Sequence, residues 1–206
     1  PTSWGYVVVD ELRAREMNAD LWPGADKHSP RDPDDETDIR VPLPQPVAPG
    51  DTLTLEVAFH DKLPSILLRT GFDGSFHMVA QWFPKIARRE ADGTWRHFTF
   101  NHLSEFYADY GRYDVSVDVP EGFSVGASGA MTEEKRAGGR VVRRFVQDDV
   151  HDFAFAAWDR FLEQKEQHDG VALRILYPRG HEEDARVELA DVAFALDRFG
   201  REFGRY

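Results

Sequence analysis

A strict alternation of apolar and polar side chains between Tyr113 and Val119 is the feature that most constrains the fold. The apolar positions are Tyr113, Val115, Val117 and Val119. Successive side chains of a β-strand point to opposite faces, so this period of two predicts a strand with one buried face. The segment closes a longer stretch, Phe76–Pro120, that is dense in aromatic side chains. We expect these aromatics to build a core rather than to line a groove.

Other segments also carry strand patterns. Leu53–Phe59 alternates in the same way, and Val171–Tyr177 is an apolar run that ends before Pro178. Shorter strands are expected at Tyr6–Leu12, Ile39–Leu43, Phe123–Ala127, Arg140–Val146 and Phe153–Trp158. Turns are expected at Gly71–Gly74, where Asp73-Gly74 is a hairpin signal, and at Glu133–Gly139; Pro23–Asp38 is expected to be a surface loop.

The last segment of the chain has helical rather than strand spacing. Its apolar side chains recur every three or four residues, at Ala185, Leu189, Val192, Leu196, Phe199 and Phe203. Acidic residues precede this stripe and arginines follow it, which complements a helix dipole. The sequence therefore predicts a mainly β fold, with antiparallel or mixed sheets in a saddle-like sandwich and a C-terminal α-helix.

Composition limits the classes of partner. The 206 residues include 25 Lys+Arg and 37 Asp+Glu, a formal net charge of −12. This acidic balance argues against nucleic acid and anionic membranes as partners, because both attract basic surfaces. The chain has no cysteine, which excludes disulfides and thiolate metal sites, and no apolar run near the ~20 residues of a membrane span. We expect a soluble chain, and its compartment stays undetermined.

Complete catalytic motifs are missing from this sequence. The nearest match to the zinc motif His-Glu-x-x-His is His181–Asp184, which is followed by Ala185 instead of the second histidine. Gly126–Gly129 is one residue shorter than a nucleophile elbow. His102 with Glu105 is read as a hydrogen-bonded pair, and the acidic run Asp32–Glu36 as a solvated loop rather than a calcium site. We therefore predict no catalytic residue and no metal ligand in this chain.

Four short motifs give a resemblance to a known family. They are Gln81–Lys85, Glu105–Val115, Gly126–Gly129 and Val150–Ala154. In this order they resemble the N-terminal β-domain of the alanyl-aminopeptidase (gluzincin) family of zinc metallopeptidases. Better-known members carry an Arg…Pro-Cys-x-Asp pattern where this chain has Trp82–Lys85, so the resemblance is to a divergent bacterial branch.

The resemblance implies that the chain is part of a longer polypeptide with separate N-terminal and catalytic domains. Residues 1–180 would form the N-terminal β-domain without its first strands, and residues 181–206 would open the catalytic zinc domain that follows. The fragment would be inactive alone and hold no cofactor, with zinc bound elsewhere in the parent aminopeptidase. Its partners would be that catalytic domain and the peptide substrate, whose free amino group Gln81 would bind. An edge-strand homodimer is a further expected partner state.

Two alternative functions follow from the aromatic-rich stretch. One is a free-standing β-sandwich module that binds carbohydrate or protein through partly exposed aromatics such as Trp95. The other is a glycosidase, suggested by Glu105, Asp109 and Asp114 among aromatic residues. Hydrolysis of a glycoside requires two carboxyl groups about 5–9.5 Å apart across a cleft, a separation that a sequence does not reveal.

Overall fold

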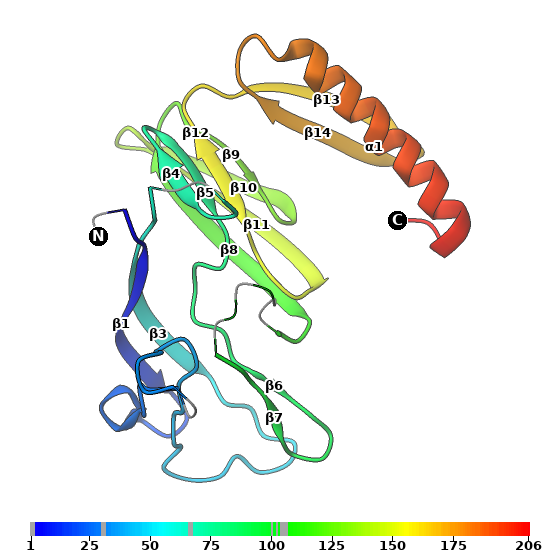
Figure 1. Cartoon of the computed structure of the whole chain (residues 1–206). Coiled ribbons are helices and arrows are strands. Elements are labelled where there is room, and N and C mark those ends of the chain that lie inside the picture. The colour runs from blue at the N-terminus through cyan, green and yellow to red at the C-terminus, as the bar shows by residue number, and fades with distance from the viewer. Residues whose placement is uncertain (1–2, 30–31, 66–67, 100, 102, 104–106) are drawn as a thin grey trace. The chain divides into compact units, whose positions relative to one another are not determined.

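The computed structural model describes residues 3–29, 32–65, 68–99, 101, 103 and 107–206 (Figure 1). Strands account for 44% of the chain and helix for 13%, so the fold is mainly β. The strands form several antiparallel sheets and are followed by one C-terminal helix, consistent with a β-sandwich-like fold. The predicted fold class is confirmed.

The chain divides into two compact units, each assembled from segments far apart in the sequence. Unit 1 comprises Pro1–Phe72, Val79–Tyr113 and Gln147–Ala154, and unit 2 comprises Asp73–Met78, Asp114–Val146 and Phe155–Tyr206. The C-terminal helix belongs to unit 2.

Unit 1 contains a three-stranded sheet and a small hairpin. The sheet has the order β2-β1-β3, with β1 Tyr6–Ala14, β2 Ala19–Asp20 and β3 Leu55–Lys62, and a short 3-10 helix, Trp22–Gly24, follows β2. The hairpin pairs β6 (Arg88–Arg89) with β7 (Trp95–Arg96). One core cluster forms around Leu12, Ala14 and Leu21, with Trp22 and Leu53 packed against it.

A second cluster in unit 1 is aromatic and lies around Trp82. The Trp82 ring is 6.1 Å from Phe59 and 5.2 Å from Phe83, measured between ring centroids. Its indole Nε1 donates a hydrogen bond to the Phe153 carbonyl oxygen at 3.0 Å. Phe153 itself is 1% exposed and stacks on Tyr113. Trp82, Phe83 and Tyr113 pack as the sequence predicts, although Trp82 is half-buried rather than fully enclosed. The prediction of a core is wrong for other aromatics of the same stretch, which are exposed: Trp95, Phe98, Tyr107 and Tyr110.

The remaining strands, most of whose residues belong to unit 2, form two sheets and a hairpin. One sheet has the order β4-β5-β12-β9 and the other β10-β11-β8, while β13 and β14 form the hairpin. The strand bounds are β4 Gly71–Asp73, β5 Phe76–Val79, β8 Gly111–Pro120, β9 Ser124–Ala127, β10 Ala130–Ala137, β11 Arg140–Val150, β12 Phe155–Trp158, β13 Leu162–His168 and β14 Val171–Tyr177. In β8 the predicted alternation is present: Val117 and Val119 are buried, whereas Asp114, Ser116 and Asp118 are exposed.

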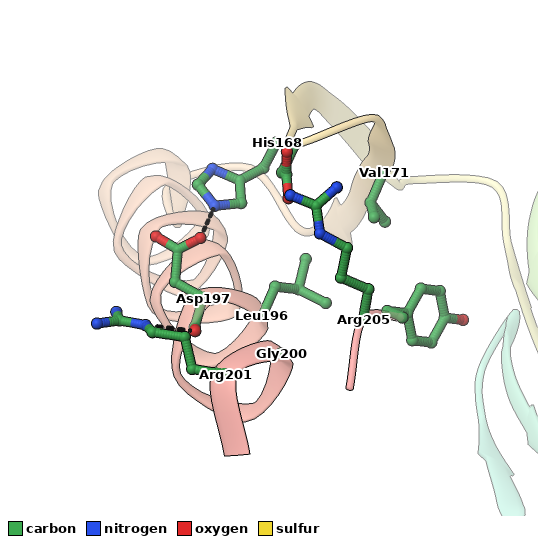
Figure 2. Close-up of a pocket in the computed structure, with 9 residues that line it drawn as sticks. His168, Val171, Leu196, Asp197, Gly200, Arg201 and Arg205 are labelled. Atoms are coloured by element: carbon green, nitrogen blue, oxygen red, sulfur yellow. Dashed lines mark hydrogen bonds and ion pairs between the residues drawn. The ribbon is translucent and has the colours of Figure 1, made fainter. Parts of the chain in front are cut away.

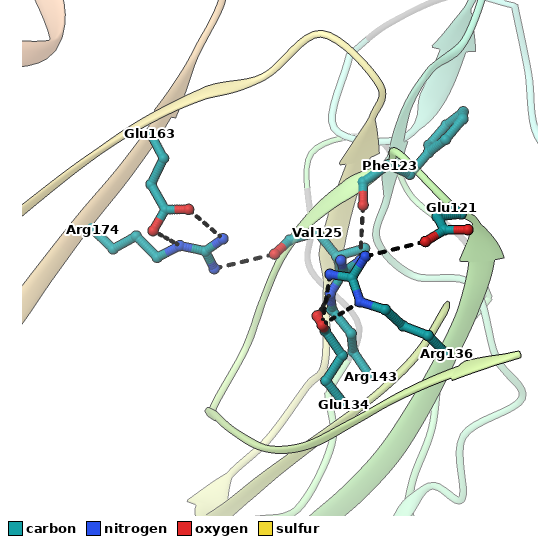
Figure 3. A network of polar contacts seen from close by, with 8 residues as sticks. All are labelled: Glu121, Phe123, Val125, Glu134, Arg136, Arg143, Glu163 and Arg174. Atoms are coloured by element: carbon teal, nitrogen blue, oxygen red, sulfur yellow. Dashed lines mark hydrogen bonds and ion pairs between the residues drawn. The ribbon is translucent and has the colours of Figure 1, made fainter. Parts of the chain in front are cut away.

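Arginine side chains connect the strands of unit 2 (Figure 3). Arg174 on β14 donates to the Val125 carbonyl oxygen of β9 at 3.1 Å and pairs with Glu163 on β13. Arg143 on β11 donates to the Phe123 carbonyl oxygen at 2.8 Å and pairs with Glu134 on β10. A planar guanidinium has several donors, so one side chain can satisfy a backbone carbonyl and a carboxylate together.

The helix α1 (Glu182–Phe203) lies along the β13–β14 hairpin (Figure 1). Only Ala185 and Leu189 of the predicted stripe are fully buried. Other large apolar side chains of the helix are exposed; they are Val187, Val192, Phe194, Phe199 and Phe203. The predicted helix is confirmed, but the hairpin covers only part of its apolar surface.

Two predicted elements are wrong. Ile39–Leu43 is not a strand, since Arg40 makes only an isolated bridge with Asp26, and Pro42 cannot donate to a ladder. Glu133–Gly139 is not a turn: most of it lies in β10, and only Gly138-Gly139 turns. Strand β13 was not predicted at all.

The turn predicted at Gly71–Gly74 is wrong in its bounds, because Gly71–Asp73 is strand β4. The hairpin that the Asp73-Gly74 signal indicates is present, with its turn at Gly74-Ser75. The described residues contain no helix that is both long and apolar enough to cross a membrane.

Replacing Trp82 tests the aromatic cluster of unit 1. Trp82→Ala is expected to lower the free energy of unfolding by about 3 kcal/mol, the lower end for a large core aromatic because the ring is half-buried. Trp82→Phe, which keeps ring packing and removes the donor to Phe153, is expected to cost about 1 kcal/mol. Denaturant unfolding measures both; a loss below ~1 kcal/mol for the alanine variant contradicts a core role.

Candidate functional site

Three polar side chains of unit 1 form a compact cluster. Lys85 Nζ lies 2.8 Å from Gln81 Oε1 and 2.8 Å from Asp152 Oδ2. Gln81 Nε2 also donates to Asp152 Oδ2 at 2.7 Å. The Lys85 and Asp152 side chains are only 16% and 21% exposed. The result is a largely buried ammonium group held by an amide oxygen and a carboxylate.

The backbone fixes two members of this cluster. Gln81 has a φ of 54°, in the left-handed region that non-glycine residues seldom adopt. Such conformations cost about 1–3 kcal/mol and gather at functional sites. Asp152 Oδ1 accepts the Phe153 backbone N–H at 2.8 Å, which orients the carboxylate. Local strain at Gln81 is therefore offset by hydrogen bonds from its side chain.

The cluster unites two of the four motifs noted in the sequence, Gln81–Lys85 and Val150–Ala154. Gln81 is not in a strand bonded to backbone groups; its amide contacts the side chains of Lys85 and Asp152. Sequence reasoning selected Gln81 but missed both partners. Their presence in the same two motifs was the only available signal, because 71 residues separate Gln81 from Asp152.

The glycines of Gly126–Gly129 have structural explanations within unit 2. A Cβ added at Gly126 would approach Leu176 Cδ1 to 2.9 Å, so close packing between β9 and β14 favours glycine there. Gly129 has a φ of 84° in the turn before β10. Packing and backbone conformation thus explain both glycines without a nucleophile elbow.

The other sequence candidates do not assemble a site. His102 and Glu105 lie outside the described residues. Asp114 pairs with Arg144, and His181 Nδ1 lies 2.7 Å from Asp184 in the first turn of α1. Among described residues, no group of three or more His, Cys, Asp and Glu side chains could hold a metal ion.

Unit 2 has a cavity of about 310 Å³ between the β13–β14 turn and the end of α1 (Figure 2). His168 Nε2 lies 2.8 Å from Asp197 Oδ1 on the cavity wall. Arg205 Nη2 lies 3.3 Å from Asp169 Oδ2. Leu196 and Val171 line the apolar side. These two contacts link the β13–β14 turn to α1 and to the residues after it.

Unit 1 has a second cavity, of about 430 Å³, beside the β6–β7 hairpin. It is lined by Glu90, Arg96, His97, Phe98 and Tyr107. A guanidinium, a carboxylate, an imidazole and two aromatic rings thus face one space, a lining suited to a small charged molecule.

Burial raises the pKa of two other groups in unit 1. Asp61 on β3 has its pKa raised by burial, and its Oδ1 atom is buried without a hydrogen-bond partner among described residues. Tyr113 has its pKa raised by burial and by the nearby Asp152 charge, and its hydroxyl donates to the His151 carbonyl oxygen at 3.3 Å.

Comparisons with known proteins identify no family for this chain. No protein-family model matches the chain, and no curated protein matches it.

A double-mutant cycle tests the buried ion pair. Lys85→Met and Asp152→Asn are each expected to lower the free energy of unfolding by about 2–3 kcal/mol, because each alters one partner of a mostly buried pair. The double variant should cost less than the sum, with a coupling of about 1 kcal/mol or more. Lys135→Met, which breaks an exposed pair with Glu133, is the control and should cost under ~0.5 kcal/mol. Additive single losses contradict the pairing.

Asp61→Asn tests the raised pKa. A carboxyl group whose pKa is higher in the folded state is easier to ionise in the unfolded state, so it destabilises the fold once the pH exceeds its ordinary pKa of about 3.9. The asparagine variant is therefore expected to unfold at higher denaturant concentration at pH 7, and its advantage should shrink as the pH falls toward about 4. An advantage that does not vary between these pH values argues against ionisation of Asp61 as the cause.

Proposed function

We propose that this chain is a non-catalytic N-terminal β-domain of a zinc-dependent aminopeptidase of the gluzincin class. The observation that carries the proposal is the Lys85 ammonium held between Gln81 Oε1 and Asp152 Oδ2. Two acceptors placed in this way bind a primary ammonium, which is the group that distinguishes the free N-terminus of a peptide from an internal amide.

In the proposed role, Gln81 and Asp152 bind the substrate's amino group. A charged ammonium gains charge-assisted hydrogen bonds from the carboxylate, whereas an acylated N-terminus offers no positive charge. Lys85 already occupies this position, so its side chain must leave before a substrate amino group binds. The domain would thereby favour peptides with free N-termini and contribute no step to bond cleavage.

The zinc ion belongs to another part of the proposed polypeptide. The described residues of this chain offer no cluster of metal ligands. Zinc would activate a water molecule for peptide hydrolysis in the catalytic domain of the proposed parent polypeptide. No step in that reaction is assigned to a residue of this chain.

The exposed apolar residues of α1 support the proposal that another domain packs against this helix. Phe194 and Phe203 are 69% and 80% exposed, and Val192 and Phe199 are also exposed. Large exposed apolar side chains that gather on one helix indicate an interaction surface. In the proposed architecture α1 opens the catalytic domain, whose other helices would cover these residues. An edge-strand homodimer stays a prediction, and charged residues on the exposed edge strand β10 oppose pairing there.

A free-standing binding module is the second candidate, favoured by Trp95. Its side chain is 49% exposed, as expected for a ring that contacts a ligand. Carbohydrate binding that is lost in Trp95→Ala, while the fold survives, would support this function. The coding sequence after Tyr206 separates the candidates, since an aminopeptidase requires an in-frame His-Glu-x-x-His with a downstream glutamate.

Kinetics of the full-length protein test the role of Gln81. Gln81→Ala is expected to reduce kcat/KM for aminoacyl substrates about tenfold, because a hydrogen bond to a charged group contributes about 1.5–3 kcal/mol. Gln81→Asn, which tolerates the left-handed backbone, separates loss of the contact from loss of the fold. Gln147→Ala removes an exposed glutamine of the same unit and should leave kinetics unchanged. Wild-type kcat/KM in a folded Gln81→Ala variant rules out the substrate contact.

A further inference from the structure

The β6–β7 hairpin presents different chemistry on its two faces. Its register pairs Arg88 with Arg96 and Arg89 with Trp95. Because adjacent residues of a strand point to opposite faces, Arg88 and Arg96 share one face with Glu90, while Arg89 and Trp95 share the other. On the second face the Arg89 guanidinium lies 5.6 Å from the Trp95 ring centroid.

The first face carries two guanidinium groups side by side. Like charges on directly opposite residues destabilise a strand pair, so this arrangement requires compensation. Arg96 Nε lies 3.2 Å from Glu90 Oε1, and Arg88 Nη1 donates to the Tyr107 hydroxyl at 2.7 Å. Arg88 Nε is buried without a hydrogen-bond partner among described residues, and the Asp109 carboxylate oxygen Oδ2 lies 3.9 Å from it. Some N–H donors of these two guanidinium groups therefore remain without an acceptor among described residues.

The 430 Å³ cavity beside this face has both apolar and charged walls. Phe98 and Tyr107 are partly exposed and provide ring surfaces, while Arg96 and Glu90 provide opposite charges. His97 Nδ1 lies 2.7 Å from Asp38 Oδ2, which fixes the imidazole at the wall. The volume falls within the roughly 300–1,000 Å³ range of small-molecule sites.

We propose that this cavity binds the α-carboxylate of an amino acid with an apolar side chain, either free or as the C-terminal residue of a peptide. The Arg96 side chain is 67% exposed, and its guanidinium has Nη donors beyond the Nε that faces Glu90, so it can bind the carboxylate. Phe98 and Tyr107 contact the apolar side chain. In a free amino acid the ammonium group binds Glu90. This site is separate from the Gln81 cluster and does not depend on the proposed peptidase role.

Titration calorimetry on the 206-residue chain tests the proposal with three matched probes: L-phenylalanine, N-acetyl-L-phenylalanine and L-phenylalaninamide. The first two carry the carboxylate and are expected to bind, whereas the amide should bind at least about tenfold more weakly, because it forms no charge-assisted carboxylate contact. Tighter binding of phenylalanine than of its acetyl derivative identifies a free amino acid as the ligand; equal or tighter binding of the acetyl derivative identifies a peptide C-terminus.

Variants on the two faces of the hairpin locate the site. Arg96→Gln removes the exposed guanidinium and is expected to weaken binding about tenfold or more. Arg89→Gln, on the opposite face, is the matched control and should leave binding unchanged. Thermal unfolding of both variants checks that the fold is retained. The proposal is overturned if neither carboxylate probe binds, if the amide binds as tightly as phenylalanine, or if folded Arg96→Gln binds as the wild type does.

Discussion

Unit 1 depends on the contact between the Gln81–Lys85 segment and Asp152–Phe153. The indole of Trp82 donates to the Phe153 carbonyl, and the side chains of Gln81 and Lys85 contact the Asp152 carboxylate. These contacts join two segments that lie 71 residues apart in the sequence. They must therefore offset the conformational entropy that is lost when the intervening chain is closed into a loop. They also leave a largely buried charge pair, which is stable only while both partners are present. The same contacts thus support the fold and build the candidate ammonium site.

Arginine has two different uses in this chain. In unit 2, Arg174 and Arg143 each satisfy a backbone carbonyl and a carboxylate, so their donors serve the sheets. In the β6–β7 hairpin, Arg88 and Arg96 lie opposite each other with a single glutamate at the same face. The first arrangement satisfies the local interactions of the fold, and the second leaves donor capacity beside a cavity. Residues whose local interactions are left unsatisfied by the fold are often part of a functional site.

Whether an element was predicted correctly depends on whether one of its sides is buried. Strand β8 and helix α1 each have one buried side, so the period of their apolar residues predicted them correctly. Strand β10 is exposed along its whole length, and its residues form a strand because β11 supplies backbone hydrogen bonds. A charged edge strand has no apolar period, so the sequence of Glu133–Gly139 predicts a turn instead of a strand. In β13 the apolar signal is equally weak, and pairing with β14 decides its structure.

The sequence by itself determined the mainly β class, the half-buried face of β8, the hairpin turn after Asp73 and the position of α1. Each of these follows from local periodicity or turn chemistry, which act over a few residues. Only the tertiary structure decided that Lys85 and Asp152 meet Gln81, that Arg96 lines a cavity with Tyr107, and that the apolar residues of α1 are only partly covered. Such contacts join residues distant in the chain, and their geometry depends on how strands pair and side chains pack, which local patterns do not specify.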